Sequence, residues 1–155
     1  MRYSTLQFFS LKAEVAGELG DKSVITDIAA RPPVIEKLDF QLQWWRNSAI
    51  CERILIFVVT TAASQDLTKN GLTGFELRPC TVSKTDEYYY YQRENDPTRA
   101  EKLPSLEWLH ITGKPFVDDF GLRLGANIKQ GLIVSERALA VLRAHNLDFA
   151  EVSEA

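Results

Sequence analysis

The chain has 155 residues, a length that suggests one domain with its own apolar core. It is 45% hydrophobic and 25% charged, as expected of a soluble globular protein. The net charge of −3 argues against binding to a nucleic-acid backbone, and the longest apolar run, residues 54–59, is too short to span a bilayer. We therefore expect neither nucleic acid nor membrane as a partner.

Targeting and cofactor signals are absent from the sequence. The N-terminal segment MRYSTLQFF lacks the apolar stretch and cleavage site of a signal peptide, so we expect a cytoplasmic protein. Cys51 and Cys80 lie beside apolar runs, which favours buried free thiols, with a disulfide as the alternative. A metal site requires more ligands at suitable spacing, so no metal or other cofactor is expected.

The first third of the chain is predicted to consist of strands. Residues 2–11 are rich in aromatic and β-favouring side chains and predict a first strand. Residues 23–28 form a short strand or a surface segment. Apolar and polar side chains then alternate over residues 38–44, which predicts a strand with one buried face; a helix over 34–45 is the alternative.

Two segments, about 54–82 and 131–153, predict the same local structure. Each contains a strand, a Thr or Ser N-cap, a short helix, a Gly or Asn stop and a second strand. Aligning Thr60 with Ser135 gives an offset of 75 (135 − 60). Further apolar pairs follow at that offset: Val59 with Val134, Ala63 with Ala138, Leu67 with Leu142 and Leu72 with Leu147. We interpret these segments as pseudo-repeat units, with chance similarity as the alternative.

Four consecutive tyrosines follow the first unit. Pro79 interrupts the predicted exit strand, which indicates an edge strand or a bulge, and residues 88–92 are predicted to return as its hairpin partner. A strand places alternate side chains on opposite faces. Either one pair of rings lies in the core and the other covers a solvent face, or the rings contact a partner: Tyr88, Tyr89, Tyr90 and Tyr91.

The remaining segments are predicted from composition. Residues 93–104 are polar and form a linker between the halves, residues 106–111 form a strand, and residues 116–127 are irregular or form a short helix. The predicted fold class is therefore α+β or α/β, a single domain of two related halves on a shared mixed β-sheet.

No residue pattern indicates catalysis. His110 in a strand and His145 in the last turn of a helix are interpreted as structural. Asp118 precedes Asp119, Phe120 and Gly121, which match the Asp-Phe-Gly triplet of kinases, but the other kinase motifs are missing. The two carboxylates are better interpreted as a turn or a solvated patch that meets a basic partner. We expect that the protein is not an enzyme.

The closing segment carries a resemblance. VDDFGLRLGANIKQ followed by LIVSERALAVLRAHNLDFAEV resembles the C-terminal signature of an immunity-protein family of bacterial polymorphic toxin systems, expanded in myxobacteria. The middle of that family is similar to two earlier segments of this chain, ILIFVVT and LTKNGLTGFELRPCTV, and the MRY start also fits. The resemblance therefore covers roughly residues 50–152. Paralogues often carry two CxxCG zinc motifs; this chain has no CxxC, so the resemblance implies no zinc.

The resemblance implies a protein that binds a cognate toxin and blocks it. On that hypothesis the contacts are exposed aromatic and acidic side chains: Trp44, Trp45, Tyr88, Tyr89, Tyr90, Tyr91, Asp118 and Asp119. A small regulatory or scaffold domain with another protein partner is the alternative, and a small-ligand-binding protein or enzyme is a further one. The sequence does not specify an oligomeric state.

Overall fold

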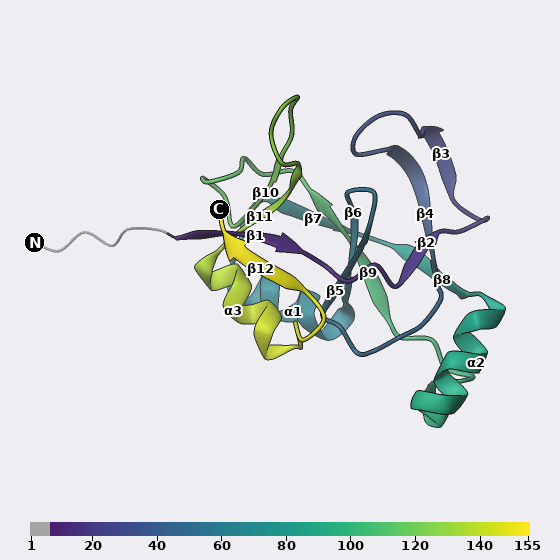
Figure 1. Cartoon of the computed structure of the whole chain (residues 1–155). Helices are drawn as coiled ribbons and strands as arrows, with labels where there is room; N and C mark the ends of the chain where they lie inside the picture. Colours follow the sequence, from purple (N-terminus) through teal and green to yellow (C-terminus); the bar gives the residue numbers. More distant parts are fainter. Residues whose placement is uncertain (1–6) are drawn as a thin grey trace, which may run out of the picture.

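In the computed structural model, which describes residues 7–155, the strands form three four-stranded sheets (Figure 1). Sheet A is antiparallel, in the order β10 (Phe120–Arg123), β11 (Gly131–Ser135), β1 (Phe8–Lys12) and β12 (Glu151–Glu154). Sheet B is antiparallel, in the order β5 (Ile50–Arg53), β6 (Ile56–Thr60), β9 (Leu106–Ile111) and β7 (Phe75–Arg78). In sheet C, the central strand β4 (Val34–Leu42) pairs with β2 (Gly17–Leu19), β3 (Val24–Asp27) and, in parallel, β8 (Cys80–Lys84).

Three α-helices complete the domain: α1 (Thr61–Lys69), α2 (Asp86–Asn95) and α3 (Glu136–Ala144). A single 3-10 turn, η1 (Pro97–Arg99), follows α2 in the described chain. This combination of helices and sheets confirms the predicted α+β class. The prediction of one shared sheet is wrong. Strands β6 and β7 of the first predicted unit lie in sheet B and its last residues lie in β8 of sheet C, whereas the second unit lies in sheet A.

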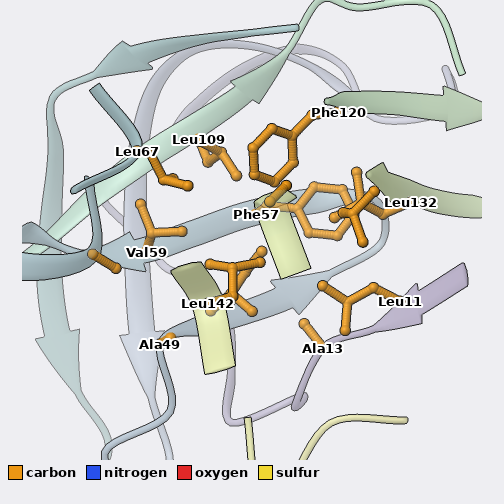
Figure 2. Packing of buried hydrophobic residues seen from close by; sticks show 14 of the residues in the cluster. Leu11, Ala13, Ala49, Phe57, Val59, Leu67, Leu109, Phe120, Leu132 and Leu142 are labelled. Carbon is orange, nitrogen blue, oxygen red and sulfur yellow. The ribbon is translucent and has the colours of Figure 1, made fainter. Parts of the chain in front are cut away.

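Sheet B is buried on both faces, which explains why its central strand is a continuous apolar run. Phe57 and Val59 of β6 point into a first core that also contains residues of sheet A, α1 and α3. Ile56 and Val58 point into a second core, shared with sheet C. Figure 2 shows the first core, in which Leu67 and Leu142 of the two helices gather with strand residues such as Leu132.

The two repeat units have the same strand register. In the structure each predicted unit gains the strand before it, and the first unit ends at β7. From here on the first unit is β5, β6, α1 and β7, and the second unit is β10, β11, α3 and β12. The strand between β6 and β7 is β9, whereas the strand between β11 and β12 is β1. Leu109 lies opposite Phe57 and Leu77 in sheet B, and Leu11 lies opposite Leu132 and Val152 in sheet A. The offset is again 75 (132 − 57 and 152 − 77), so each half supplies the other half's central strand. Descent from one duplicated unit stays a prediction.

The helix termini repeat at the same offset. The hydroxyl of Thr60 accepts a hydrogen bond from the Ala63 N–H, and that of Ser135 accepts one from the Ala138 N–H, each at 3.1 Å. Beyond the helices, Gly71 (φ 64°) and Asn146 (φ 97°) have left-handed backbones. The predicted caps and stops are therefore confirmed.

The other predicted elements vary in accuracy. The strand over residues 38–44 is part of β4, and the first strand covers residues 8–12, while residues 2–6 of that prediction lie outside the described residues. Pro79 separates β7, an edge strand of sheet B, from β8 in sheet C. The predicted linker over 93–104 begins inside α2, and a strand, β10, lies within the segment expected to be irregular.

Candidate protein-binding surface

The four tyrosines lie on a helix, α2, and not on the predicted strand. Thr85 caps the helix through a hydrogen bond from the Tyr88 N–H, and Asp86 and Glu87 occupy the first turn. Arg93 lies in the last turn. Carboxylates near a helix N-terminus and cations near its C-terminus stabilise the helix dipole, and this outweighs the local β preference of tyrosine.

One face of α2 is directed into the molecule. Tyr88 is fully buried, and its hydroxyl lies within hydrogen-bonding distance of the carbonyl oxygens of Lys102 (2.8 Å) and Arg99 (3.2 Å). Burial raises the pKa of Tyr88. The carboxamide oxygen of buried Gln92 accepts a hydrogen bond from the Trp45 N–H. These contacts fix the orientation of the helix on the second core.

The opposite face of α2 is open to solvent. Tyr90 is 66% exposed, and its ring meets that of Tyr89 edge to face at 5.6 Å. The Arg93 guanidinium lies 5.7 Å from the centre of the Tyr89 ring. Three exposed carboxylates accompany these rings on α2: Asp86, Glu87 and Glu94. The exposed face is therefore both aromatic and acidic.

The aromatic side chains continue from α2 to the segment before β5. The Tyr91 ring lies 6.3 Å from that of Trp44, and the Arg46 guanidinium lies 5.9 Å from the Trp44 ring. The same guanidinium lies 3.7 Å from the ring of Phe149 and pairs with the buried carboxylate of Glu14. We define the aromatic surface by the following residues: Trp44, Arg46, Asp86, Glu87, Tyr89, Tyr90, Tyr91, Arg93, Glu94 and Phe149.

Trp44 has a further property. Its indole N–H is buried and has no hydrogen-bond acceptor among the described residues. A buried donor without an acceptor costs about 1–3 kcal/mol. This N–H therefore lies beneath the aromatic surface and is not open to solvent.

Three residues predicted to contact a partner are buried. Tyr88 is fully buried, Trp45 is 4% exposed and Asp119 is 7% exposed. Tyr88 and Trp45 belong to the second core. The prediction of surface contact is therefore wrong for these three, because the helical geometry of α2 turns Tyr88 inward and because Asp119 has partners within the chain.

Asp119 is the centre of a polar network in the second unit, not part of a solvated patch. Its carboxylate accepts hydrogen bonds from the Arg137 guanidinium (2.8 and 2.9 Å), the Ser135 hydroxyl (2.6 Å) and the Thr73 N–H (2.8 Å). Burial alone would raise the pKa of Asp119, but these hydrogen bonds and the Arg137 charge together hold it well below its usual range. The neighbouring Asp118 accepts a bond from the Lys114 N–H and closes a turn.

The histidines and cysteines have separate environments. His145 Nε2 lies 2.5 Å from Asp66 Oδ2, a contact between the end of α3 and α1. Burial, with the Arg78 charge as a smaller cause, lowers the pKa of His110. The cysteines are free thiols, as predicted; Cys51 is buried and Cys80 half-buried. Burial raises the pKa of both, that of Cys80 to about 11. Within residues 7–155, no group of three His, Cys, Asp or Glu side chains is arranged to hold a metal ion.

Sequence reasoning missed Arg46, Phe149 and the acidic residues of α2. A signal for the helix was present, because Thr85 followed by Asp86 and Glu87 is a typical N-terminus. No local signal indicated that Arg46 and Phe149, far apart in the chain, lie against each other.

Comparison with protein-family models finds no match to this chain, and comparison with curated proteins finds none either. In the part of the chain that the structure describes, no helix has both the length and the apolar character needed to cross a membrane.

Proposed function

We propose that this chain is an immunity protein, which acts in the cytoplasm by binding a cognate bacterial toxin and blocking it through protein–protein contact. The observation that carries the proposal is the exposed face of α2, where Tyr90 stands 66% exposed among acidic side chains. The resemblance of residues 50–152 to immunity proteins points to the same class.

The chemistry of the aromatic surface suits a protein partner. Tyrosine, tryptophan and arginine are the residue types that most often dominate binding energy at interfaces. Exposed carboxylates at the rim of such a contact increase the association rate with a positively charged partner. We therefore expect a toxin with a basic face.

A regulatory or scaffold domain remains the second candidate, because an aromatic and acidic surface serves any basic protein partner. The toxicity of the partner distinguishes the two candidates. A ligand-binding or enzymatic site around His110 and Asp118 has less support, since the ring of His110 lies against Trp108 and Asp118 is bonded to its own turn.

The test begins with a tagged chain expressed in its native organism and the identification of co-purifying proteins by mass spectrometry. Each stoichiometric partner is then expressed alone and together with this chain. Growth arrest that the chain relieves is the expected result. Growth arrest that the chain cannot relieve would refute the proposal for that partner, and a partner that is harmless alone would favour the regulatory candidate.

Variants then test the surface itself. We expect Tyr90→Ala to weaken binding roughly 30-fold, equivalent to about 2 kcal/mol, as for an interface hot spot. Glu94→Lys should lower the association rate, with a weaker effect at high salt. Ile28→Ala and Glu36→Lys, at exposed positions on and next to the β3–β4 hairpin, are the matched controls and should bind as the wild type does. Equal binding by all four variants would exclude the aromatic surface while leaving the immunity function intact.

A further inference from the structure

A second exposed apolar region lies at the β10 end of sheet A. Four large apolar side chains there are between 42% and 62% exposed: Phe116, Val117, Leu124 and Ile128. They belong to two loops, residues 112–119 before β10 and residues 124–130 between β10 and β11. The second loop extends beyond the end of its sheet (Figure 1). A contiguous exposed apolar patch marks an interaction site, whereas single exposed apolar side chains need no explanation.

The first loop is fixed in position by close packing. The Asp118 carboxylate accepts a hydrogen bond from the Lys114 N–H at 2.7 Å. The backbone at Lys114 and Pro115 passes so close to Gly121 that a Cβ there would lie 2.3 Å from the Pro115 nitrogen. The ring of Phe116 meets that of Phe8 edge to face at 5.7 Å. Its exposed apolar side chains are thus presented on a defined backbone.

The second loop is connected to the first. The Arg123 guanidinium lies 5.7 Å from the centre of the Phe116 ring, and its Nε donates to the Lys129 carbonyl at 3.1 Å. The side chain of Ile128 lies over Gly125, where an added Cβ would meet it at 3.2 Å. Arg123 therefore joins the two loops, and we call their exposed apolar side chains and the cations beside them the loop surface.

The charge of the loop surface is opposite to that of the chain as a whole. Residues 112–131 contain three cations, Lys114, Arg123 and Lys129, and two carboxylates. One carboxylate, Asp119, is buried and paired with Arg137, so the loops carry three cations against Asp118 alone, a net of +2 (3 − 1). The full chain carries −3. The loop surface therefore favours an anionic partner.

The side-chain types distinguish a lipid from a protein partner. Leucine and valine are uncommon among the residues that dominate protein interfaces, whereas tyrosine and tryptophan, which are common there, are concentrated on the aromatic surface. Amphipathic helices that lie in a membrane interface combine phenylalanine and leucine with lysine and arginine. The two loops combine similar residue types on a non-helical backbone. Each such cation is attracted by anionic headgroups. We infer that the loop surface docks onto an anionic lipid surface, with Leu124, Ile128, Phe116 and Val117 entering the headgroup region.

This contact requires no membrane-spanning segment, so it is compatible with the short apolar runs of the chain. The sequence alone predicted no membrane partner because its longest apolar run is too short to span a bilayer, and a peripheral contact needs no such run. The inference does not depend on the proposed immunity function, since the aromatic surface consists of other residues.

The test is co-sedimentation of the purified chain with vesicles of phosphatidylcholine, and with vesicles of an equimolar mixture of phosphatidylcholine and phosphatidylglycerol. We expect binding to the mixed vesicles that falls as ionic strength rises, and little binding to phosphatidylcholine alone. Ile128→Asp and Lys129→Glu should each lower the partition coefficient by roughly tenfold or more, because each removes a favourable contact and adds a repelled charge.

Matched controls exclude general stickiness and misfolding. Ile28→Asp and Lys37→Glu change exposed residues of the same types in the β3–β4 hairpin and should bind vesicles as the wild type does. All four variants should retain the wild-type melting temperature. Equal binding to both vesicle types, or full binding by Ile128→Asp, would overturn the inference. Binding to soluble polyglutamate without binding to the mixed vesicles would assign the surface to an acidic protein and would also overturn it.

Discussion

The two repeat units share a backbone plan but differ at one junction, where the strand pair meets the helix N-terminus. In the second unit, Asp119 connects Arg137 and Ser135, and it also accepts a hydrogen bond from Thr73 of the first unit. Strand pairing aligns Phe120 with Ile50, because they lie opposite Val134 and Val59, so Asp119 corresponds to Ala49. The offset of 75 makes Ala62 the equivalent of Arg137. The first unit therefore has an apolar junction and the second an ionic one.

One backbone hydrogen bond is common to both junctions. The Thr60 N–H donates to the Ala49 carbonyl at 3.0 Å, and the Ser135 N–H donates to the Asp119 carbonyl at 2.9 Å. This backbone bond forms whether the residue is Ala49 or Asp119. The backbone geometry therefore does not depend on the ionic network around Asp119. The network adds to a junction that the strand register already specifies.

The largest expected loss of stability comes from placing a carboxylate equivalent to that of Asp119 in the first unit without its arginine partner. Ala49 is fully buried in the first core, so Ala49→Asp places an unpaired charge there and should destabilise the fold by about 3–5 kcal/mol. Ala49→Asp combined with Ala62→Arg should recover at least about 1 kcal/mol if the junctions are equivalent. Urea unfolding measures both. A double variant no more stable than Ala49→Asp would break the comparison.

Equivalent core leucines should respond alike. Leu67 and Leu142 are fully buried in the same cluster, so Leu67→Ala and Leu142→Ala should each lose about 2–5 kcal/mol of unfolding free energy. Leu124→Ala, at an exposed position, is the control and should change stability by less than about 0.5 kcal/mol. A loss confined to one helix would show that the two units pack differently.

The ionic junction should make stability depend on pH. The folded state lowers the pKa of Asp119, so its carboxylate stabilises the fold above the unfolded value of about 4, and this contribution is lost as pH falls through the folded value. Asp119→Asn should therefore lose about 1–3 kcal/mol at neutral pH and progressively less in acid. Urea unfolding of the wild type and Asp119→Asn at a series of pH values from neutral to acid measures this difference in unfolding free energy. Asp148→Asn, an exposed control, should show no such trend, and a loss independent of pH would contradict the assignment.

The smallest effect concerns the helix caps. Thr60→Ala removes a capping bond alone and should cost about 1 kcal/mol. Ser135→Ala removes a capping bond and the bond to Asp119, so its cost should approach about 2 kcal/mol. Differential scanning calorimetry of both variants checks the order. Equal losses would show that the Ser135–Asp119 bond adds nothing to the cap.

Local patterns predicted the features that local physics controls. The caps at Thr60 and Ser135, the stops at Gly71 and Asn146, and the constant offset between the units follow from short-range hydrogen bonds and apolar spacing. The side chains that meet at Asp119 are separated in sequence by up to 64 residues (137 − 73), and no pattern within a single segment shows that they meet.

The candidate surface was predicted in part. Tyr89, Tyr90 and Tyr91 are at the surface or partly buried, together with Trp44, but the helix that presents them was mistaken for a strand. Consecutive tyrosines favour a strand locally, but the capping residues before them favour a helix N-terminus, and the segment is helical. Tyr88 and Trp45 were misplaced because burial depends on which face of an element packs against the core.

The exchange of central strands also sets an order for folding during synthesis. Sheet B is complete once β9 has been made, whereas β1 waits for Leu132, which follows Leu11 by 121 residues (132 − 11). At synthesis rates of about 5–20 residues per second, this delay is roughly 6 to 24 seconds. During that time the apolar side of β1 has no partner strand and is open to chaperones or to wrong pairings. We expect β1 to stay protease-sensitive in nascent chains that end before β11, and to become protected only when sheet A closes.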